Sequence, residues 1–561
     1  MWRLYRSFKR TLLARLVGLY GEEIVNRLLE RFALVCGRYS FLEEQCSVDA
    51  PCWDERSCIV ITYGDMITRG DEPPLVTLHR FLIDYLGEVA TGVHLLPFFP
   101  YSSDDGFSVI DYRQVDPALG SWDDVRRIGD DFRLMVDLVI NHVSTSSGWF
   151  QDYIGAIAPA RDYFIDVDEG LDLSQVVRPR TSQLLTPVHT VKGERRVWTT
   201  FSADQVDLNY KNPDVLLEIV DIMLSYIKNT AGIIRLDAIA YLWKEIGTSC
   251  INLPETHEVV KLLRDIIDNV TPGTLLLTET NLPHEENISY FGKGDEAHLV
   301  YQFSLPPLLL HTLQSGSAAY LCQWVADLEP PPAGCNFVNF TASHDGIGVR
   351  PLEGLLSPEE IAWLANVVRK CGGYISSRST PDGGEQPYEL NITYFDAMID
   401  PHHPEDTDRQ FKRFFCSQII MLGLQGIPAI YFHSLTGTRN NARGVADTGV
   451  HRAINRGRWK NDELRGLLDN SETITGQVFR AYTALLAKRA EQPAFHPDAE
   501  QQLVATADNL FAIQRLPRQG PPVTCIHNVT GENQQIAWNE VGKVLTKGTG
   551  GWDIIYEEEV G

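Results

Sequence analysis

The stretch GIIRLDA at residues 232–238 is a near-continuous apolar run that ends in an aspartate. Other runs of strand length share this texture: CIVITY (58–63), GVHLLP (92–97), LMVDLVINH (134–142), TLLLTET (274–280), HLVYQF (298–303), NFVNFTASHD (336–345) and GIPAIYFH (426–433). Amphipathic stretches of helix length separate several of them, as PETHEVVKLLRDIIDNV does at 254–270. Eight such runs are typical of strands that are buried on both faces and joined by crossover helices. The sequence therefore predicts an α/β fold, an eight-stranded (β/α)8 TIM barrel.

Two connections, at about 143–210 and 346–410, are too long for ordinary barrel loops. We expect each to fold as a small inserted subdomain on the carboxyl-terminal rim, because long loops without elements of their own are uncommon in compact domains. The barrel itself is predicted over 56–494.

Both ends of the chain differ from this barrel pattern. Apolar and polar residues alternate in the segments 503–516, 521–529 and 534–538, which predicts an antiparallel β-domain over 495–561. At the other end, a helical extension is predicted over 1–55. Within it, the segment 22–39 spaces Ile24, Val25, Leu28, Leu29 and Phe32 as an amphipathic helix does, so we expect that helix to dock on a larger body.

Composition excludes several classes of function. The 561 residues hold 49 Lys and Arg against 74 Asp and Glu, a formal charge of −25, which disfavours nucleic acid and anionic membranes as partners. The ten cysteines form no Cys-x-x-Cys pair, so neither a zinc knuckle nor a redox motif is indicated. Basic residues interrupt the apolar runs near the N-terminus, and no stretch has the length of a membrane span. We therefore expect a cytoplasmic protein.

Three acidic residues lie at the ends of predicted strands. Asp237 ends the fourth run, Glu279 lies at the end of the fifth, and Asp345 ends the seventh. A single acid in such a place is more often a helix cap or a solvated loop residue. Catalytic groups of a barrel also sit where strands end, and these acids are accompanied by three basic side chains, those of Arg235, His142 and His344. The set therefore favours one active site.

The chemistry that needs such a set is cleavage of a glycosidic bond. One carboxylate attacks the anomeric carbon while a second, protonated, donates to the leaving oxygen. We expect Arg235 to keep Asp237 ionised and a less polar environment to keep Glu279 protonated. Neighbouring barrel strands lie about 4.8 Å apart, close to the roughly 5–5.5 Å separation of a retaining pair. Retention of configuration is therefore predicted.

Four strings carry a family resemblance: DLVINH (137–142), GIIRLDA (232–238), TET (278–280) and SHD (343–345). They resemble the conserved regions of the α-amylase superfamily, glycoside hydrolase family 13. Further strings are similar to sucrose phosphorylase and its relatives, among them HLLPFFPYSSDDGF (94–107), RLDAIAYLWKEIGTSC (235–250), HDGIG (344–348) and INR (454–456). The resemblance runs from about residue 57 to the C-terminus.

This resemblance implies roles for individual residues. Asp237 is expected to be the nucleophile, Glu279 the general acid/base and Asp345 the transition-state stabiliser. The expected glucosyl-binding residues are Asp104, Phe107, His142, Arg235, His344 and Arg456. Phe150 is a further aromatic that packs either near the sugar or within the rim.

A second group of residues is expected to bind phosphate and the acceptor. Arg180, Tyr241 and Tyr388 match positions of the sucrose phosphorylase pattern, although Arg180 has a plain surface ion pair as its alternative. Asn281 and Glu389 depart from that pattern, where the family has His and Gln. A neutral amide in place of a titratable imidazole changes the leaving-group side, which argues against sucrose.

The strings TETNLPHEENISYFG (278–292) and HDGIGVRPLEGLL (344–356) are more similar to the glucosylglycerate phosphorylases of the same subfamily. Their substrate carries a carboxylate, which Arg180 or Arg350 is suited to pair with. We expect a retaining α-glucoside phosphorylase that releases α-D-glucose 1-phosphate. Specificity for sucrose or glucosylglycerol stays open, as do an α-glucosidase or transglucosidase and a catalytically silent barrel.

The resemblance also bears on metals and partners. Many amylases bind calcium through the residue that corresponds to Asn141, but a single Asn beside scattered acids does not define an oxygen cage. No metal and no organic cofactor are predicted. The expected partners are a small α-glucoside, inorganic phosphate and α-glucose 1-phosphate, with a homodimer as a further possibility.

Overall fold

A closed barrel of eight parallel strands forms the centre of the protein. The computed structural model describes residues 6–45, 52–167, 170–379, 384–532 and 534. In space the strands follow the order β1-β16-β12-β11-β10-β9-β4-β3. Their bounds are β1 Ile59–Thr62, β3 Gly92–Leu95, β4 Arg133–Val139, β9 Ala231–Asp237, β10 Leu275–Thr278, β11 Leu299–Tyr301, β12 Asn336–Asn339 and β16 Ile427–Tyr431. Six of them fall within a predicted run, and β4 and β9 begin one residue before theirs, so the barrel prediction is confirmed.

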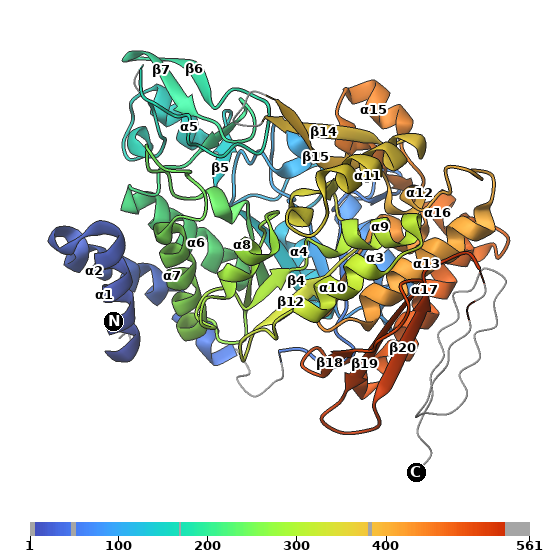
Figure 1. Cartoon of the computed structure of the whole chain (residues 1–561). Helices are drawn as coiled ribbons and strands as arrows, with labels where there is room; N and C mark the ends of the chain where they lie inside the picture. The colour runs from blue at the N-terminus through green and yellow to red at the C-terminus, as the bar shows by residue number, and fades with distance from the viewer. Residues whose placement is uncertain (1–5, 46–51, 168–169, 380–383, 533, 535–561) are drawn as a thin grey trace.

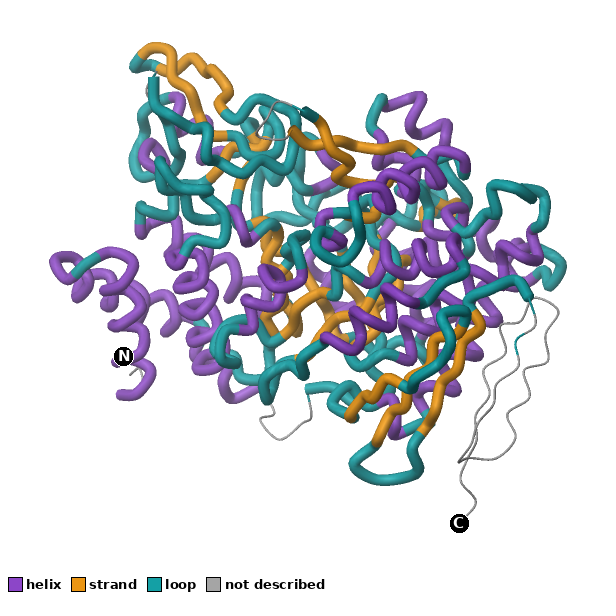
Figure 2. Tube along the Cα trace, in the orientation of Figure 1, coloured by secondary structure: helices purple, strands orange, loops and turns teal. Residues whose placement is uncertain are grey.

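Helices surround this barrel, and Figure 2 shows the strands enclosed by them. Both faces of the strands are therefore covered, which explains why the runs are almost entirely apolar. The longer helices of this layer are α3 (Pro74–Leu86), α4 (Trp122–Asp131), α6 (Pro213–Lys228), α7 (Pro254–Val270), α9 (Leu305–Ser315), α10 (Ala319–Asp327), α13 (Thr407–Gly423) and α17 (Ile474–Ala490).

Both long connections contain secondary structure of their own. The first carries β5 (His142–Ser144), α5 (Gly148–Ile154), β6 (Leu185–Thr190), β7 (Gly193–Trp198) and β8 (Gln205–Asp207). The second carries β13 (Ile347–Gly348), α11 (Pro358–Lys370), β14 (Tyr374–Ser379), β15 (Glu385–Asn391) and α12 (Tyr394–Ala397). Because they follow β4 and β12, both rise from the carboxyl-terminal rim, at the top of Figure 1. The exact domain boundaries stay predictions.

The chain continues into a small antiparallel sheet, as predicted. It is formed by β18 (Glu500–Leu503), β19 (Leu510–Leu516) and β20 (Val523–Asn528), in the order β18-β19-β20. The segment 534–538, predicted as a further strand, lies outside the described residues apart from position 534.

Two antiparallel helices lie against the outside of the barrel helices. They are α1 (Arg6–Tyr20), which packs on α7, and α2 (Glu22–Arg38), which packs on α6 (Figure 1). Arg15 of α1 forms ion pairs with Glu258 at 3.2 Å and Asp265 at 3.1 Å on α7. The predicted amphipathic helix is confirmed, except that Ile24 faces solvent with 42% of its surface exposed.

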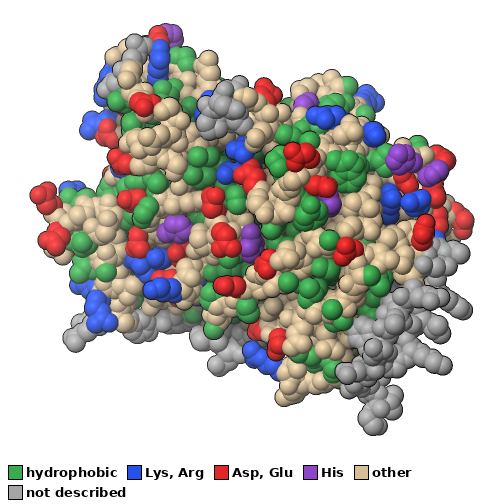
Figure 3. Space-filling view, viewed as in Figure 1, with side chains coloured by type: hydrophobic (Ala, Val, Ile, Leu, Met, Phe, Trp, Pro, Cys, Tyr) green, Lys and Arg blue, Asp and Glu red, His purple; other side chains and the backbone are tan. Residues whose placement is uncertain are grey.

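The surface of the described residues carries charged side chains of both signs. Acidic, basic and apolar side chains are interspersed over the face shown in Figure 3. Within the described residues no helix has the length and apolar character needed to cross a bilayer.

Candidate active site

Neighbouring barrel strands place the first two acids side by side. In the β9–β10 ladder Leu236 pairs with Thr278, and the backbone N–H of Glu279 then donates to the carbonyl of Leu236 at 3.0 Å. Asp237 is the last residue of β9, and Asp345 follows β12. All three acids line one pocket at the carboxyl-terminal mouth of the barrel. The arrangement is the one expected of a barrel active site.

The backbone after Asp237 connects the two strand ends. Ala238 adopts a left-handed conformation with a φ of 51°, and its N–H donates to Oε2 of Glu279 at 2.9 Å. A non-glycine residue in this conformation is strained, and such strain concentrates at functional sites. The turn thereby holds the Glu279 carboxyl beside Asp237.

Asp237 and Glu279 form a buried pair of like charges. Burial raises the pKa of both carboxyls, and Glu279 raises the pKa of Asp237 further, so the pair tends to retain a proton. Arg235 opposes this at Asp237, where its Nη1 donates to Oδ1 at 2.8 Å. The hydrogen bond to Glu279 comes instead from the neutral N–H of Ala238. The guanidinium therefore favours the ionised form of Asp237, but it also lowers the pKa of Glu279, as does the N–H of Ala238. That Glu279 holds the proton stays a prediction. The sequence predicted that Arg235 favours the ionised form of Asp237, but it predicted neither the burial of Asp237 nor its repulsion by Glu279.

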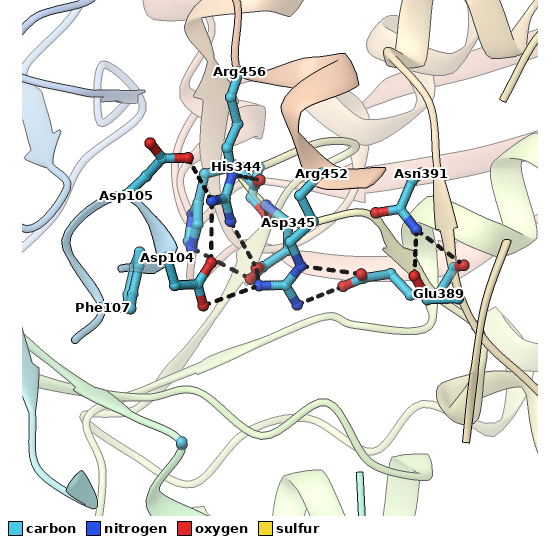
Figure 4. Close-up of polar contacts among 12 residues, drawn as sticks. Asp104, Asp105, Phe107, His344, Asp345, Glu389, Asn391, Arg452 and Arg456 are labelled. Carbon is cyan, nitrogen blue, oxygen red and sulfur yellow. Dashed lines mark hydrogen bonds and ion pairs between the residues drawn. The ribbon is translucent and has the colours of Figure 1, made fainter. Parts of the chain in front are cut away.

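The third acid, Asp345, is surrounded by cations (Figure 4). Nη1 of Arg452 lies 2.6 Å from its Oδ1, and Nη2 of Arg456 lies 3.9 Å from the same oxygen. Burial alone raises the pKa of Asp345, but Arg452, His344 and Arg456 together hold it well below the ordinary value. Asp345 is therefore a fixed negative charge facing the pocket.

Arg456 organises one wall of the pocket without lining it. Its Nη1 contacts Asp104 at 3.1 Å and Asp105 at 2.8 Å, and its Nε donates to the carbonyl of His344 at 2.9 Å (Figure 4). The rings of Phe107 and His344 stack with centroids 4.5 Å apart. This gives an apolar surface beside charged hydrogen-bonding groups, a combination that suits the face and the hydroxyls of a sugar ring.

The pocket brings together nearly all of the predicted site residues. Its lining includes the predicted Asp104, Phe107, His142, Arg180, Asp237, Tyr241, Glu279, Asn281, His344, Asp345, Tyr388 and Glu389. Arg235 and Arg456 stand one layer behind and act through the acids that they pair with. Phe150 packs instead against Tyr153 and Phe164, in the rim.

Sequence reasoning missed seven residues of the lining. Ala238, Ala240, Thr280 and Leu282 lie next to predicted residues in the chain, whereas Arg452, Phe201 and Gln205 lie apart from them. Arg452 lies one helical turn before Arg456 in HRAINR, a spacing that signals a shared direction for the two side chains. Gln205 lies on β8, where its Nε2 donates to the carbonyl of Phe107 at 3.2 Å. Only the fold of the first inserted segment brings it there.

The acceptor side of the pocket is formed by both inserted segments. The guanidinium of Arg180 lies over the ring of Tyr388, 5.3 Å from the centroid, and no described acid pairs with it. Glu389 receives two hydrogen bonds from Arg452, at 2.7 and 3.1 Å, and so is itself neutralised. Oδ1 of Asn281 is buried without a hydrogen-bond partner among the described residues. Unsatisfied groups of this kind await a ligand or water.

The environment of Asn141 differs from a cation cage. Nζ of Lys244 lies 2.6 Å from Oδ1 of Asn141 and 2.6 Å from Oδ2 of Asp207, which sits on β8. Lys244 thus supplies a built-in positive charge between these oxygens. Among the described residues no group of three or more His, Cys, Asp or Glu side chains is placed to hold a metal ion.

The comparisons with known proteins agree with this geometry. The family model for the α-amylase catalytic domain matches residues 82–329. The chain is 47% identical to the glucosylglycerate phosphorylase of Allomeiothermus silvanus, over 98% of this chain and 97% of that protein. It is 49% identical to the glucosylglycerate phosphorylase of Spirochaeta thermophila, over 88% and 84%. The crystal structure of sucrose 6F-phosphate phosphorylase from Thermoanaerobacter thermosaccharolyticum superimposes with a TM-score of 0.73 at 26% identity, covering 85% of this chain and 94% of that one.

Proposed function

The chain belongs to the α-amylase family, in its sucrose phosphorylase-like branch, and we propose that it is a glucosylglycerate phosphorylase. The observation that carries this proposal is the similarity to two such phosphorylases, which reaches almost the full length of both chains in the first case. The pocket supports it, because it holds the acids that a glycoside phosphorylase needs and a cation, Arg180, that forms no ion pair with any described acid. The substrates are accordingly glucosylglycerate and inorganic phosphate, and the products are glycerate and α-D-glucose 1-phosphate.

The first half of the reaction breaks the glycosidic bond. The Asp237 carboxylate attacks the anomeric carbon, while Glu279 gives its proton to the departing glycerate oxygen. Asp345 provides negative charge where the oxocarbenium-like transition state develops positive charge. The products of this half are free glycerate and a β-glucosyl ester of Asp237.

The second half resolves this ester. A phosphate oxygen attacks the anomeric carbon from the face that glycerate has left, the ester bond to Asp237 breaks, and Glu279 accepts the proton of the nucleophile. Two inversions give net retention, so the product is the α-phosphate. The individual roles of these residues stay predictions.

Phosphate must be bound in order to compete with water for the ester. Arg180 supports this step, because it lines the pocket, stacks on Tyr388 and is free of any described acid partner. A guanidinium in this setting is suited to bidentate contacts with a phosphate.

An acceptor panel tests the function. The protein is incubated with α-glucose 1-phosphate and either glycerate, fructose or glycerol, and phosphate release is measured with Asp237→Ala as the inactive control. We expect glycerate to give the highest kcat/KM. A preference for fructose or glycerol would reassign the substrate, and release that no acceptor accelerates would indicate a hydrolase. No turnover in any arm would indicate a binding protein.

Location and assembly are further proposals. The free thiols of the described residues, most of them buried, support a cytoplasmic location, since reducing compartments keep cysteines unpaired. The homodimer stays a prediction, and light scattering of the purified protein tests it.

A further inference from the structure

Arg350 is a buried cation for which the structure shows no partner. Only 7% of its surface is exposed, and its Nε is buried without a hydrogen-bond partner. No carboxylate among the described residues forms an ion pair with it. A buried charge without a partner carries a large desolvation free energy unless a counter-ion or hydrogen-bonding ligand compensates it.

The strand β13, which ends two residues before Arg350, runs along the acceptor side of the pocket. In the β13–β15 pair Gly348 lies opposite Glu389, and the N–H of Val349 donates to the carbonyl of Tyr388 at 3.1 Å. Gly348 also packs directly on Asn281, since a Cβ built there would lie 2.3 Å from Oδ1 of that side chain. Arg350 follows at the start of the short helix Arg350–Leu352. Arg350 thus directly follows the two residues that contact Asn281 and Tyr388, and it is not itself part of the pocket lining.

The charge of Arg350 acts electrostatically on a residue that lines the pocket. Burial raises the pKa of the Tyr241 phenol, and both Arg350 and Arg180 oppose that rise. Tyr241 lines the pocket, so both cations lie within electrostatic range of its acceptor side. In a partly buried site such a charge acts over several ångströms without direct contact.

The other cations near the reacting centre are already neutralised. Arg235 pairs with Asp137 and Asp237. Figure 4 shows that Arg452 pairs with Asp345 and Glu389, and Arg456 with Asp104 and Asp105. Arg178, Arg180 and Arg350 form no ion pair with a described residue; of these three, Arg180 lines the pocket and Arg350 is the one that is buried.

The reaction brings two anionic groups to the acceptor side at different depths. In α-glucose 1-phosphate the phosphorus is bonded directly to the glycosidic oxygen. In glucosylglycerate the carboxyl carbon lies at least one bond further away, whichever glycerate hydroxyl carries the glucose. Arg180, in the pocket lining, suits the nearer anion, and Arg350, which is not part of the lining, suits the more distant one.

We infer that Arg350 determines specificity for an acidic acceptor: its buried guanidinium, unpaired among the described residues and carried by the segment that packs on Asn281 and Tyr388, supplies the positive charge that selects the carboxylate of glycerate. The inference rests on the proposed function and adds to it the residue that recognises the carboxylate of the acceptor. Arg180 by contrast serves phosphate.

Acceptor kinetics with a phosphate-free donor test this inference. With α-glucosyl fluoride as donor, kcat/KM is measured for glycerate, glycerol and phosphate in the wild type, Arg350→Gln and Arg350→Lys. Glycerol differs from glycerate by having a neutral hydroxymethyl group in place of the carboxylate. We expect Arg350→Gln to lower the glycerate value about 10- to 100-fold, to leave glycerol within about threefold, and Arg350→Lys to restore much of the loss.

The matched control is Arg378→Gln. Arg378 binds Glu353 at 2.6 Å next to the same short helix, so its loss disturbs the segment without removing the unpaired charge. Equal losses for glycerate and glycerol in Arg350→Gln, or a loss confined to phosphate, would overturn the inference. The glycerol arm in the same preparation reports that the variant is folded. Wild-type protein that does not use glycerate at all would instead refute the proposed function.

Discussion

Arg452 shows how a single side chain sets the electrostatics of the pocket. It contacts Asp345, lies 3.8 Å from Asp104 and binds Glu389 through two nitrogens, so it connects the glucosyl side with the acceptor loop (Figure 4). In the proposed mechanism Asp345 acts in the transition state through its negative charge, and Arg452 is the strongest influence that lowers its pKa and so keeps it ionised.

We expect Arg452→Met to move the acidic limb of the pH profile of kcat/KM to higher pH. Without the guanidinium the burial of Asp345 dominates and raises its pKa, so the active, ionised form is lost at a higher pH than in the wild type, by about one unit or more. The pH–rate profile measures this shift. Arg439→Met is the control, because Arg439 pairs with Asp396 at 2.8 Å and neither residue lines the pocket. An unchanged limb in Arg452→Met would contradict this account of Asp345.

We expect Arg180 to contribute more to the reaction of the glucosyl-enzyme with phosphate than to its reaction with water. Arg180→Gln should lower kcat/KM for phosphate about 10- to 100-fold, because charge-assisted hydrogen bonds are lost, while hydrolysis of α-glucosyl fluoride without phosphate stays within about threefold. Product analysis with and without phosphate measures both rates. Arg161→Gln, a change at an exposed arginine of the same inserted segment that pairs with Asp162, is the control. Equal loss of the two activities would show that Arg180 does not bind phosphate.

At the scale of elements, Lys244 fastens the first inserted segment to the barrel. Asp207 on β8 receives hydrogen bonds from Asn141 and from Thr200 as well as its contact with Lys244. The same strand carries Gln205, which lies beside His142 in the pocket. This buried network therefore positions one wall of the site.

Lys244→Met should lower the free energy of unfolding by about 3–5 kcal/mol, because it leaves the buried Asp207 carboxylate without its cation. Urea denaturation measures the change. The matched control is Lys211→Met, which removes a solvent-exposed pair with Glu245 and should cost less than about 1 kcal/mol. Similar losses for the two variants would argue against a special role for the buried lysine.

The elements also show what patterning can and cannot predict. The barrel strands were predictable because burial on both faces leaves an apolar signature in each run. The inserted segments were predictable only as insertions, since strands such as β5, β8 and β13 are only two or three residues long and others, such as β6 and β7, are half-exposed. Residues that reach the pocket from them, Phe201 and Gln205, were accordingly missed.

At the scale of the whole molecule, the N-terminal helices stabilise the barrel from outside. α1 buries Leu12 and Leu16 completely against the barrel helices, and the hydroxyl of Tyr20 donates to the carbonyl of Tyr210 at 3.0 Å. These contacts lie on the outer helical layer, whereas the pocket opens at the mouth of the barrel.

We therefore expect Leu16→Ala to reduce stability without changing catalysis. The cavity should cost about 2–5 kcal/mol in the opening free energy of the two helices, measured by amide hydrogen exchange along α1. At a temperature where the variant is folded, kcat should match the wild type. Leu34→Ala is the control, since Leu34 is 70% exposed and its loss should cost under about 0.5 kcal/mol. A lowered kcat in Leu16→Ala would reveal coupling between the extension and the pocket.

The sequence by itself determined the barrel, the three acids at the strand ends and the family, because double burial and short motifs leave local signatures. Only the tertiary structure decided how these groups are charged and partnered. The pKa of a carboxyl depends on its burial and on residues distant in the chain, as Arg452 and Glu279 show for Asp345 and Asp237. The same holds for Arg350, because only the fold shows that its guanidinium is buried and lacks a counter-ion among the described residues.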